Sequence, residues 1–240
     1  MLQKPRHLPA RDKLTICFAH VAYRMGERFV LRNADLDWFE VRSFDDLKAH
    51  IEDVDVLLCS GFWRNELIPA APRLAFIQSI SAGTDQYSRD ALSAAGIRVA
   101  SAQGVNECAV AEHAIALILA MARQIPQARD NQNAKKWRGM IGDISKREDE
   151  LGGKALLVVG TGRIGSRLVT LAKAFDMSVI AIRRDPSKGA GAADKVVGED
   201  ELLGMLPQAD FVALTCPLTP ETEKLIDADA LGFEIGRAHV

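Results

Sequence analysis

Short apolar runs alternate with amphipathic segments along the first hundred residues of the chain. The runs predict strands, and the segments with helical spacing between them predict helices. Ser43, with Asp46 three residues later, is typical of a helix start, and Gly96 is typical of a helix end. The expected strands cover residues 14–19, 38–41, 54–59, 74–80 and 97–100, and the expected helices cover residues 23–32, 43–51 and 85–95. This alternation predicts a parallel α/β sheet.

The pattern changes after residue 104. Residues 109–123 are apolar on nearly every side, which predicts a buried helix. A more polar helix is expected from Pro126 to about Trp137, and residues 141–150 are expected to form an exposed loop. We therefore expect two domains, residues 1–104 and 105–233, with this pair of helices as the bridge between them.

The second domain begins with the pattern of a strand, a turn, a helix and another strand. Residues 155–159 and 178–182 are the two strands, and apolar residues at helical spacing lie between them. The unit has the length of about 30 residues that a βαβ unit requires. Downstream, the sequence predicts strands at residues 195–197 and 211–215, a helix over 200–206 capped by Asp200, and a loop over 217–222.

The turn inside this unit carries three glycines, Gly160, Gly162 and Gly165, at the G-x-G-x-x-G spacing. The first glycine allows a sharp turn, the second lets a pyrophosphate approach the backbone, and the third lets the helix pack closely on the strand. The N–H groups and the positive dipole end of the new helix form an anion site. The context favours dinucleotide binding over an ordinary structural glycine turn.

An arginine pair follows the second strand of this unit. An NAD-selective site has an Asp or Glu about 20 residues past the glycines, where it accepts from the ribose 2′-hydroxyl. Here the chain reads Arg183-Arg184-Asp185, and a guanidinium binds a 2′-phosphate in bidentate fashion. The sequence therefore predicts that NADP(H) is preferred and NAD(H) possible. In the alternative reading, Arg183 and Arg184 are solvated and Asp185 faces the ribose.

Composition and charge narrow the class of protein. The chain has 240 residues, 48% hydrophobic and 26% charged, with a net charge of −2, so neither nucleic acid nor an anionic membrane is an expected partner. The longest apolar run, residues 114–122, is shorter than the ~20 residues that span a bilayer. The cysteines lie apart, at Cys17, Cys59, Cys108 and Cys216, and are expected to be reduced thiols, mostly buried, in a cytoplasmic protein. No metal site is expected.

Three further features are explained by ordinary structural roles when each is considered alone. Residues 81–85, which follow a strand and open a helix, could hold a carboxylate on backbone N–H groups, but a plain turn capped by Thr84 or Asp85 is favoured. His113 is expected to be a packed, hydrogen-bonded histidine of the apolar helix rather than an acid–base group. Cys108 has no His–acid arrangement around it at a recognisable spacing.

Taken together, several segments resemble the D-isomer-specific 2-hydroxyacid dehydrogenases. The resemblance covers roughly residues 50–231. It rests on Ser81-Ala82-Gly83-Thr84-Asp85, Val110-Ala111-Glu112-His113-Ala114, Trp137, the glycine turn from Gly160 to Gly165, Phe175-Asp-Met177 and Pro217-Leu-Thr-Pro-Glu-Thr222.

This resemblance implies a flavodoxin-like α/β substrate domain packed against a Rossmann-type domain, and a homodimer built on the latter. It implies that Ser81, Ala82 and Gly83 bind a small 2-keto or 2-hydroxy acid. The residues it implies for the cofactor are Gly160, Gly162, Arg163, Ile164, Gly165, Arg183, Arg184, Cys216, Pro217 and Thr222, with Arg163 and Ile164 at the pyrophosphate and Cys216 near the nicotinamide-side ribose. The family usually has an acid where Arg183 stands.

The end of the chain departs from the family. There, a catalytic Arg lies in an Asn-x-x-Arg-Gly segment after the Pro-Leu-Thr loop, followed by a Glu and a proton-transferring His. All three are expected downstream of Phe233, so none of this chain's residues is assigned a catalytic role. Residues 234–240 resemble translated sequencing adapter, so a non-native tail on an incomplete cofactor domain is expected, and Arg237 and His239 are not the catalytic pair. We expect this chain to bind cofactor without turning over substrate.

The leading hypothesis is a full-length dehydrogenase that moves hydride between NADPH and a 2-keto acid such as glyoxylate, hydroxypyruvate or pyruvate. A different class, a dinucleotide-sensing protein that acts through partners, is the alternative, because fold alone does not settle function. A dehydrogenase for formate or phosphite on the same scaffold is a weaker possibility.

Overall fold

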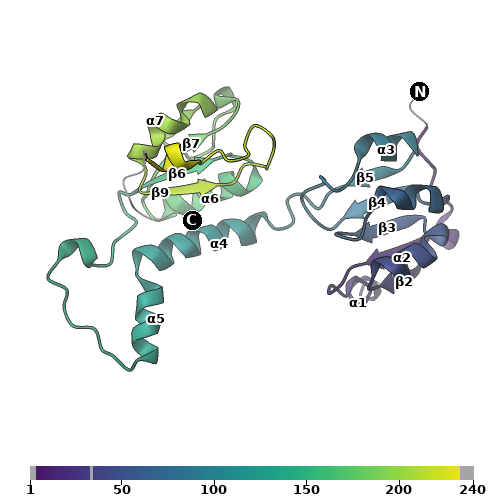
Figure 1. Cartoon of the computed structure of the whole chain (residues 1–240), viewed down its shortest axis with the longest axis horizontal. Helices are drawn as coiled ribbons and strands as arrows, with labels where there is room; N and C mark the ends of the chain where they lie inside the picture. The colour runs from purple at the N-terminus through teal and green to yellow at the C-terminus, as the bar shows by residue number, and fades with distance from the viewer. Residues whose placement is uncertain (1–3, 33–34, 233–240) are drawn as a thin grey trace. The chain divides into compact units, whose positions relative to one another are not determined.

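A computed structural model describes residues 4–32 and 35–232 of the chain (Figure 1). It divides the chain into two compact units, Met1–Val105 and Asn106–Val240. This boundary lies one residue beyond the expected one. The segment expected to be a non-native tail lies outside the described residues. Each unit is an α/β structure with its own parallel sheet, as the alternating pattern predicts.

The first unit contains a five-stranded parallel sheet in the order β2-β1-β3-β4-β5 (Figure 1). Short 3-10 turns at Arg11–Lys13, Ile51–Asp53 and Asn65–Ala70 link its elements. The strands are β1 (Thr15–Ala19), β2 (Asp37–Val41), β3 (Val56–Cys59), β4 (Phe76–Ser79) and β5 (Arg98–Ala100), and the helices are α1 (Met25–Val30), α2 (Phe44–His50) and α3 (Arg89–Ala94).

Two local signals set the helix ends in this unit as the sequence predicts. The Ser43 hydroxyl accepts from the Asp46 N–H at 3.1 Å, which caps the first turn of α2. Gly96 has a φ of +71° immediately after α3, a conformation that favours glycine at a helix end. A core of buried side chains that includes Leu57, Trp63 and Ile77 packs α2 and α3 against the sheet. On the opposite face of the sheet, Phe29 of α1 packs on Phe18 and Trp38.

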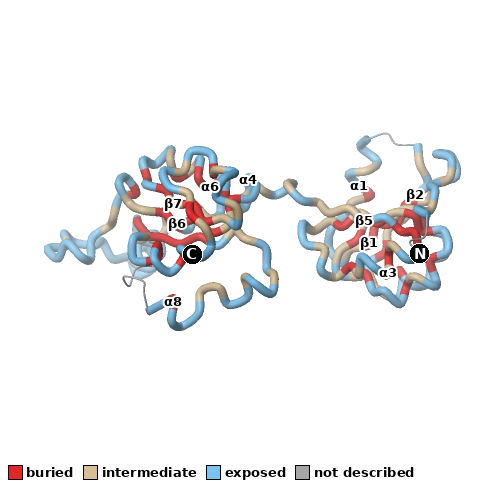
Figure 2. The backbone as a smooth tube through the Cα atoms, turned by 90° about the horizontal axis from the view of Figure 1, so that it is seen from above, coloured by how far each residue is buried: buried red, intermediate tan, exposed pale blue. Residues whose placement is uncertain are grey.

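The second unit contains a four-stranded parallel sheet in the order β8-β7-β6-β9. Figure 2 shows buried residues gathered along β6 and β7. The strands are β6 (Ala155–Val159), β7 (Ser178–Ile182), β8 (Lys195–Val197) and β9 (Phe211–Leu214), and the helices are α4 (Glu107–Ala122), α5 (Ile125–Asn133), α6 (Arg163–Ala174), α7 (Leu202–Met205) and α8 (Ala228–Gly232). Further 3-10 turns lie at Ile144–Lys146, Pro186–Lys188, Glu199–Glu201 and Leu206–Gln208.

The topology of this sheet predicts where a ligand binds. The chain runs from β6 outward to β7 and β8, and then returns to the other side of β6 as β9. Parallel sheets bind ligands at the carboxyl ends of their strands, at the point where the strand order reverses. That point is the carboxyl end of β6, where the glycine turn lies.

The predicted burial of the long helix is wrong. One stripe of α4, which includes Ala111, Ile115 and Ile118, packs into the core with residues of α6, while Val110 and Leu117 are exposed. Since α4 is apolar on nearly every side, its hydrophobic pattern predicts more burial than one covered stripe provides. Helix α5 exposes most of its residues to solvent.

Two predicted helix starts are also wrong. Helix α3 begins at Arg89, because the Ser88 hydroxyl accepts from the Ala91 N–H at 3.3 Å, so neither Thr84 nor Asp85 is the cap. Helix α7 is four residues long and follows a 3-10 turn over Glu199–Glu201, without a side-chain cap from Asp200.

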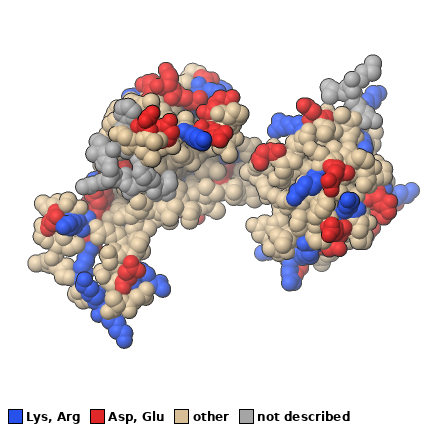
Figure 3. All heavy atoms as spheres, viewed as in Figure 1, with Lys and Arg blue, Asp and Glu red and all other residues tan. Residues whose placement is uncertain are grey.

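Charged side chains of both signs lie on the surface. Figure 3 shows acidic and basic side chains interspersed over both units on the face in view.

Among the described residues, no single helix is long and apolar enough to cross a membrane. Helices α4 and α5 meet that criterion only when they are taken together, and the pair is bent by 64°.

Candidate functional site

The glycine turn after β6 brings two distant parts of the second unit into close contact. Gly160 has a φ of +91°, and a Cβ atom there would lie 2.6 Å from the Cα of Cys216. A Cβ on Gly165 would overlap the Gly160 carbonyl oxygen and would lie 2.6 Å from Thr215 Oγ1. Neither position has room for a side chain, because β6, α6 and the end of β9 meet here.

Gly162 differs, since a Cβ built on it meets no atom within 4 Å. It is the N-cap of α6, and a glycine has no side chain to occupy the free N–H groups of the first turn. That turn reads Arg163-Ile-Gly-Ser, so no carboxylate of its own competes for the anion site. The open side of Gly162 and the free helix end fit a pyrophosphate.

A pocket of about 320 Å³ lies beside this turn. Most of the residues expected to bind the cofactor line it, namely Gly160, Gly162, Arg183, Arg184, Cys216, Pro217 and Thr222. The others, Arg163, Ile164 and Gly165, form the first turn of α6. Sequence reasoning did not assign Thr161, Lys188, Glu199, Leu202, Glu221 and Leu225, which also line the pocket. Glu199 could have been found, because it follows β8 at the same edge of the sheet.

Charged side chains gather where β7 ends. Arg183 donates through Nη1 to the Gly189 carbonyl oxygen, which folds its side chain over the following turn. Arg184 lies 3.9 Å from the Glu199 carboxylate. Both arginines line the pocket at the carboxyl end of β7, where the sequence predicts contact with the adenosine ribose.

Asp185 is held by its own neighbours. Its carboxylate accepts from the Ser187 hydroxyl at 2.6 Å and from the Ser187 N–H at 3.2 Å, and it lies 3.6 Å from Lys188 Nζ. These contacts, the Ser187 hydroxyl first, lower the pKa of Asp185 below its ordinary value. The carboxylate that could have faced a ribose is thus engaged in a local turn.

The loop after β9 closes the other side of the pocket. Thr222 donates to the Pro217 carbonyl oxygen at 2.6 Å and accepts from the Thr219 N–H at 2.8 Å, which fixes the loop shape. Cys216 is partly buried in the pocket wall, and burial raises its thiol pKa, with a smaller contribution from the Glu199 charge.

The loop expected to bind substrate carboxylate lies in the first unit, where β4 ends. The Ser81 N–H donates to Ser79 Oγ at 3.2 Å, and Ser79 Oγ donates to the Ser81 carbonyl at 3.1 Å. The hydroxyls of Ser60 and Ser81 lie 2.5 Å apart. The loop does not open a helix as the sequence predicts, since α3 begins at Arg89, so any carboxylate must be bound by the loop itself.

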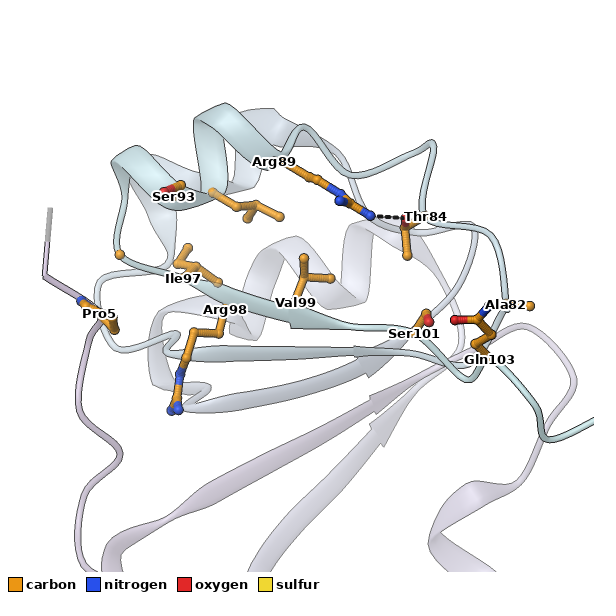
Figure 4. Close-up of a pocket in the computed structure, with 12 residues that line it drawn as sticks. Pro5, Ala82, Thr84, Arg89, Ser93, Ile97, Arg98, Val99, Ser101 and Gln103 are labelled. Atoms are coloured by element: carbon orange, nitrogen blue, oxygen red, sulfur yellow. Dashed lines mark hydrogen bonds between the residues drawn. The ribbon is translucent and has the colours of Figure 1, made fainter. Parts of the chain in front are cut away.

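Figure 4 shows a hollow of about 520 Å³ beside this loop, between α3 and β5. Ala82 and Thr84 lie at one end of it, and Arg89 donates to Thr84 Oγ1 at 3.5 Å (Figure 4). Of the residues expected to bind substrate, Ala82 thus borders a cavity of its own unit, whereas Ser81 is engaged with serines at the sheet edge.

The remaining candidates are one histidine and three cysteines. His113 is exposed on α4 rather than packed in a core, because α4 is covered on one side only. Cys17 and Cys59 are buried as expected, but Cys108 is exposed. Burial raises the thiol pKa of Cys17 to about 12 and that of Cys59 to about 11, so both are unreactive.

With this geometry established, the chain can be compared with known proteins. Residues 115–233 match the model of a family described as D-isomer specific 2-hydroxyacid dehydrogenase, NAD binding domain. The chain belongs to the D-isomer-specific 2-hydroxyacid dehydrogenase family. The predicted resemblance and the predicted Rossmann-type α/β fold are confirmed, and the glycine turn lies in a domain of the NAD-binding kind.

Relatives in this family are themselves dehydrogenases. D-3-phosphoglycerate dehydrogenase of Mycobacterium tuberculosis is 34% identical over 201 residues, which cover 82% of this chain and 37% of that protein. Formate dehydrogenase of Chaetomium thermophilum is 30% identical over 190 residues, which cover 75% of this chain and 50% of that protein.

A solved structure shares the fold. It is a D-isomer specific 2-hydroxyacid dehydrogenase family protein from Aeromonas salmonicida, with a TM-score of 0.75 at 24% identity over 90% of this chain and 68% of that one. The chain spans half or less of the length of the two named relatives. The names of these relatives do not favour the dinucleotide-sensing alternative.

Proposed function

We propose that this chain is the cofactor-binding and carboxylate-binding part of an NAD(P)-dependent oxidoreductase that acts on the CH–OH group of D-2-hydroxyacids. The observation that supports this most strongly is the open side of Gly162 at the free N-terminus of α6, inside a pocket. When bound, the nicotinamide supplies or accepts the hydride. The residues of this chain bind and orient the dinucleotide.

We propose further that the site prefers NADPH. Arg183, Arg184 and Lys188 bring three cationic side chains to the pocket where β7 ends. A 2′-phosphate needs such donors, whereas the ribose 2′-hydroxyl needs a free carboxylate. The Asp185 carboxylate is engaged with Ser187 and Lys188, which favours the phosphate. NAD(H) is the cofactor named for the family's domain, so it is the competing ligand in every test.

For the substrate, we propose a small 2-keto acid such as glyoxylate or hydroxypyruvate, with its carboxylate on the loop of Ser81, Ala82 and Gly83. The Ser60 hydroxyl at this loop adds a polar contact for an oxygen of the acid. The catalytic Arg, Glu and His that the family resemblance implies are not assigned to any described residue. Among residues 4–32 and 35–232, no histidine lines the cofactor pocket.

We also propose that the protein is a homodimer built on the second unit. Val110 and Leu117 are exposed on α4, and Trp137 and Met140 are fully exposed in the segment after α5. Large exposed apolar side chains on one stretch of chain are typical of an interface between subunits. Sedimentation of the full-length protein should give twice the monomer mass, and a monomer at micromolar concentration would contradict this proposal.

The test of the proposed reaction uses protein made from the complete gene. We expect NADPH to be oxidised when glyoxylate or hydroxypyruvate is added, and to be oxidised faster than NADH at equal concentration. The 240-residue chain should bind NADPH. If no 2-keto acid supports oxidation of either cofactor by the full-length protein, the proposed reaction is wrong.

A further inference from the structure

The hydroxyl of Thr161, between the first two glycines of the turn, is buried without a partner. The Thr161 residue is 8% exposed and lines the dinucleotide pocket. Within the described part of the chain, Thr161 Oγ1 has no hydrogen-bond partner. Two other buried polar atoms share this condition there, Gln86 Nε2 and Glu107 Oε2, and Glu107 Oε2 lies 3.9 Å from the Arg163 guanidinium.

A buried hydroxyl without a hydrogen-bond partner lowers the stability of the protein. Buried polar groups are almost always hydrogen-bonded, because burial removes the hydrogen bonds that water would make. The neighbouring hydroxyl shows the normal case, since Thr215 Oγ1 donates to the Gly160 and Val159 carbonyl oxygens. A valine has the same shape as threonine and no polar atom, so packing alone does not require a hydroxyl at position 161.

The position of Thr161 indicates what its partner is. It immediately precedes Gly162, whose open side faces the space that a pyrophosphate would occupy. The polar atoms that a bound dinucleotide would bring closest are the pyrophosphate oxygens and the hydroxyls of the adjoining ribose. All of these can accept a hydrogen bond from a threonine hydroxyl.

We propose that the Thr161 hydroxyl donates a hydrogen bond to a pyrophosphate or ribose oxygen of the bound dinucleotide. This inference rests on dinucleotide binding by the second unit, but not on the preference for NADPH. Thr161 is then a binding residue that acts through its side chain, whereas the glycines on either side act through their backbone. No described residue pairs with the hydroxyl, and a bound dinucleotide would supply its acceptor.

The test compares Thr161→Val with Thr161→Ser, and uses Thr170→Val as a matched control. Thr170 is exposed on α6, and its hydroxyl donates to the Ser166 carbonyl oxygen at 3.2 Å. Dissociation constants for NADPH and NADH are measured by fluorescence titration, and melting temperatures are measured with and without NADPH. Adenosine 2′,5′-bisphosphate, which has the 5′-phosphate but lacks the second phosphate and second ribose, is the probe that locates the contact.

We expect Thr161→Val to raise the dissociation constants for NADPH and NADH about tenfold, the loss of one hydrogen bond to an oxygen of the ligand. The free variant should melt at the wild-type temperature or above it, because valine removes an unpaired hydroxyl. Thr161→Ser and Thr170→Val should bind as the wild type does. A loss for adenosine 2′,5′-bisphosphate as well would assign the contact to the 5′-phosphate or the adenosine ribose. A loss for the whole dinucleotides alone would assign it to the second phosphate or the nicotinamide-side ribose.

Two results would overturn the inference. In the first, Thr161→Val binds both dinucleotides with wild-type affinity. In the second, the free variant melts at a lower temperature, which would show that the hydroxyl has a structural partner. If the wild-type chain binds neither dinucleotide in the same titration, dinucleotide binding itself fails and this inference fails with it.

Discussion

The two glycines that flank Thr161 should respond in opposite ways to alanine. At Gly162 the φ is −71°, and a Cβ atom meets nothing within 4 Å, so alanine fits the free protein. A glycine-to-alanine change that the backbone tolerates stabilises a protein by about 0.4–1 kcal/mol. At Gly160 the φ is +91°, and a Cβ atom would lie 2.6 Å from the backbone of Cys216.

The surroundings of the two glycines set the expected changes in the free energy of unfolding and in NADPH affinity. Gly160→Ala should lower the free energy of unfolding by about 2–6 kcal/mol, the sum of backbone strain at positive φ and overpacking against fixed backbone. Gly162→Ala should keep or raise that free energy, but its methyl group occupies the approach of the pyrophosphate. The loss of one charge-assisted hydrogen bond of about 1.5–3 kcal/mol raises the dissociation constant of NADPH roughly 10- to 150-fold.

Urea unfolding of each free variant gives the first quantity, and NADPH fluorescence titration gives the second. Wild-type NADPH affinity in Gly162→Ala would refute the assignment of the open glycine to the pyrophosphate. A Gly160→Ala protein as stable as the wild type would contradict the close approach of the turn to Cys216.

Three further predictions concern cofactor choice, pH and thiol chemistry. Arg183→Ala should weaken NADPH binding about tenfold or more and leave NADH binding unchanged, and an equal loss for both dinucleotides would contradict a phosphate contact. Lys173 lowers the pKa of Asp194, so that pair stabilises the fold at neutral pH, and its contribution is lost as pH falls through the lowered pKa. The stability difference between wild type and Asp194→Asn should therefore disappear in acid, and a difference independent of pH would argue against the pair. In native protein, iodoacetamide should modify exposed Cys108 and spare buried Cys59, as peptide mass spectrometry would show, and modification of Cys59 first would contradict its burial.

The sheet of the second unit could be predicted closely from the sequence. Strands β6, β7 and β8 begin and end at the predicted residues, because each is a short apolar run bounded by polar or glycine residues. The three glycines also occupy the environments that their spacing predicts, two against packed backbone and one facing open space. In this sheet the local sequence preferences agree with the fold, so the sequence pattern is sufficient to predict the strand bounds and the glycine environments.

The burial of α4, the start of α3 and part of the pocket lining depend on contacts in the folded protein, which the order of residues along the chain does not reveal. Helix α4 is apolar on nearly every side, and the side that becomes buried is the one against which α6 packs. The start of α3 depended on which of several neighbouring polar residues caps it, and Ser88 does so. Lys188 and Glu221 reach the pocket because β7 and β9 end at one edge of the sheet, which becomes apparent only once the strand order is known.

The most direct test of the central claim is a parallel titration of the 240-residue chain with NADPH and with NADH. We predict saturable binding of both, with the smaller dissociation constant for NADPH, because Arg183 and Arg184 line the pocket and Asp185 is engaged by its neighbours. Tighter binding of NADH would contradict the proposed preference, and binding of neither would contradict the assignment of this pocket to a dinucleotide.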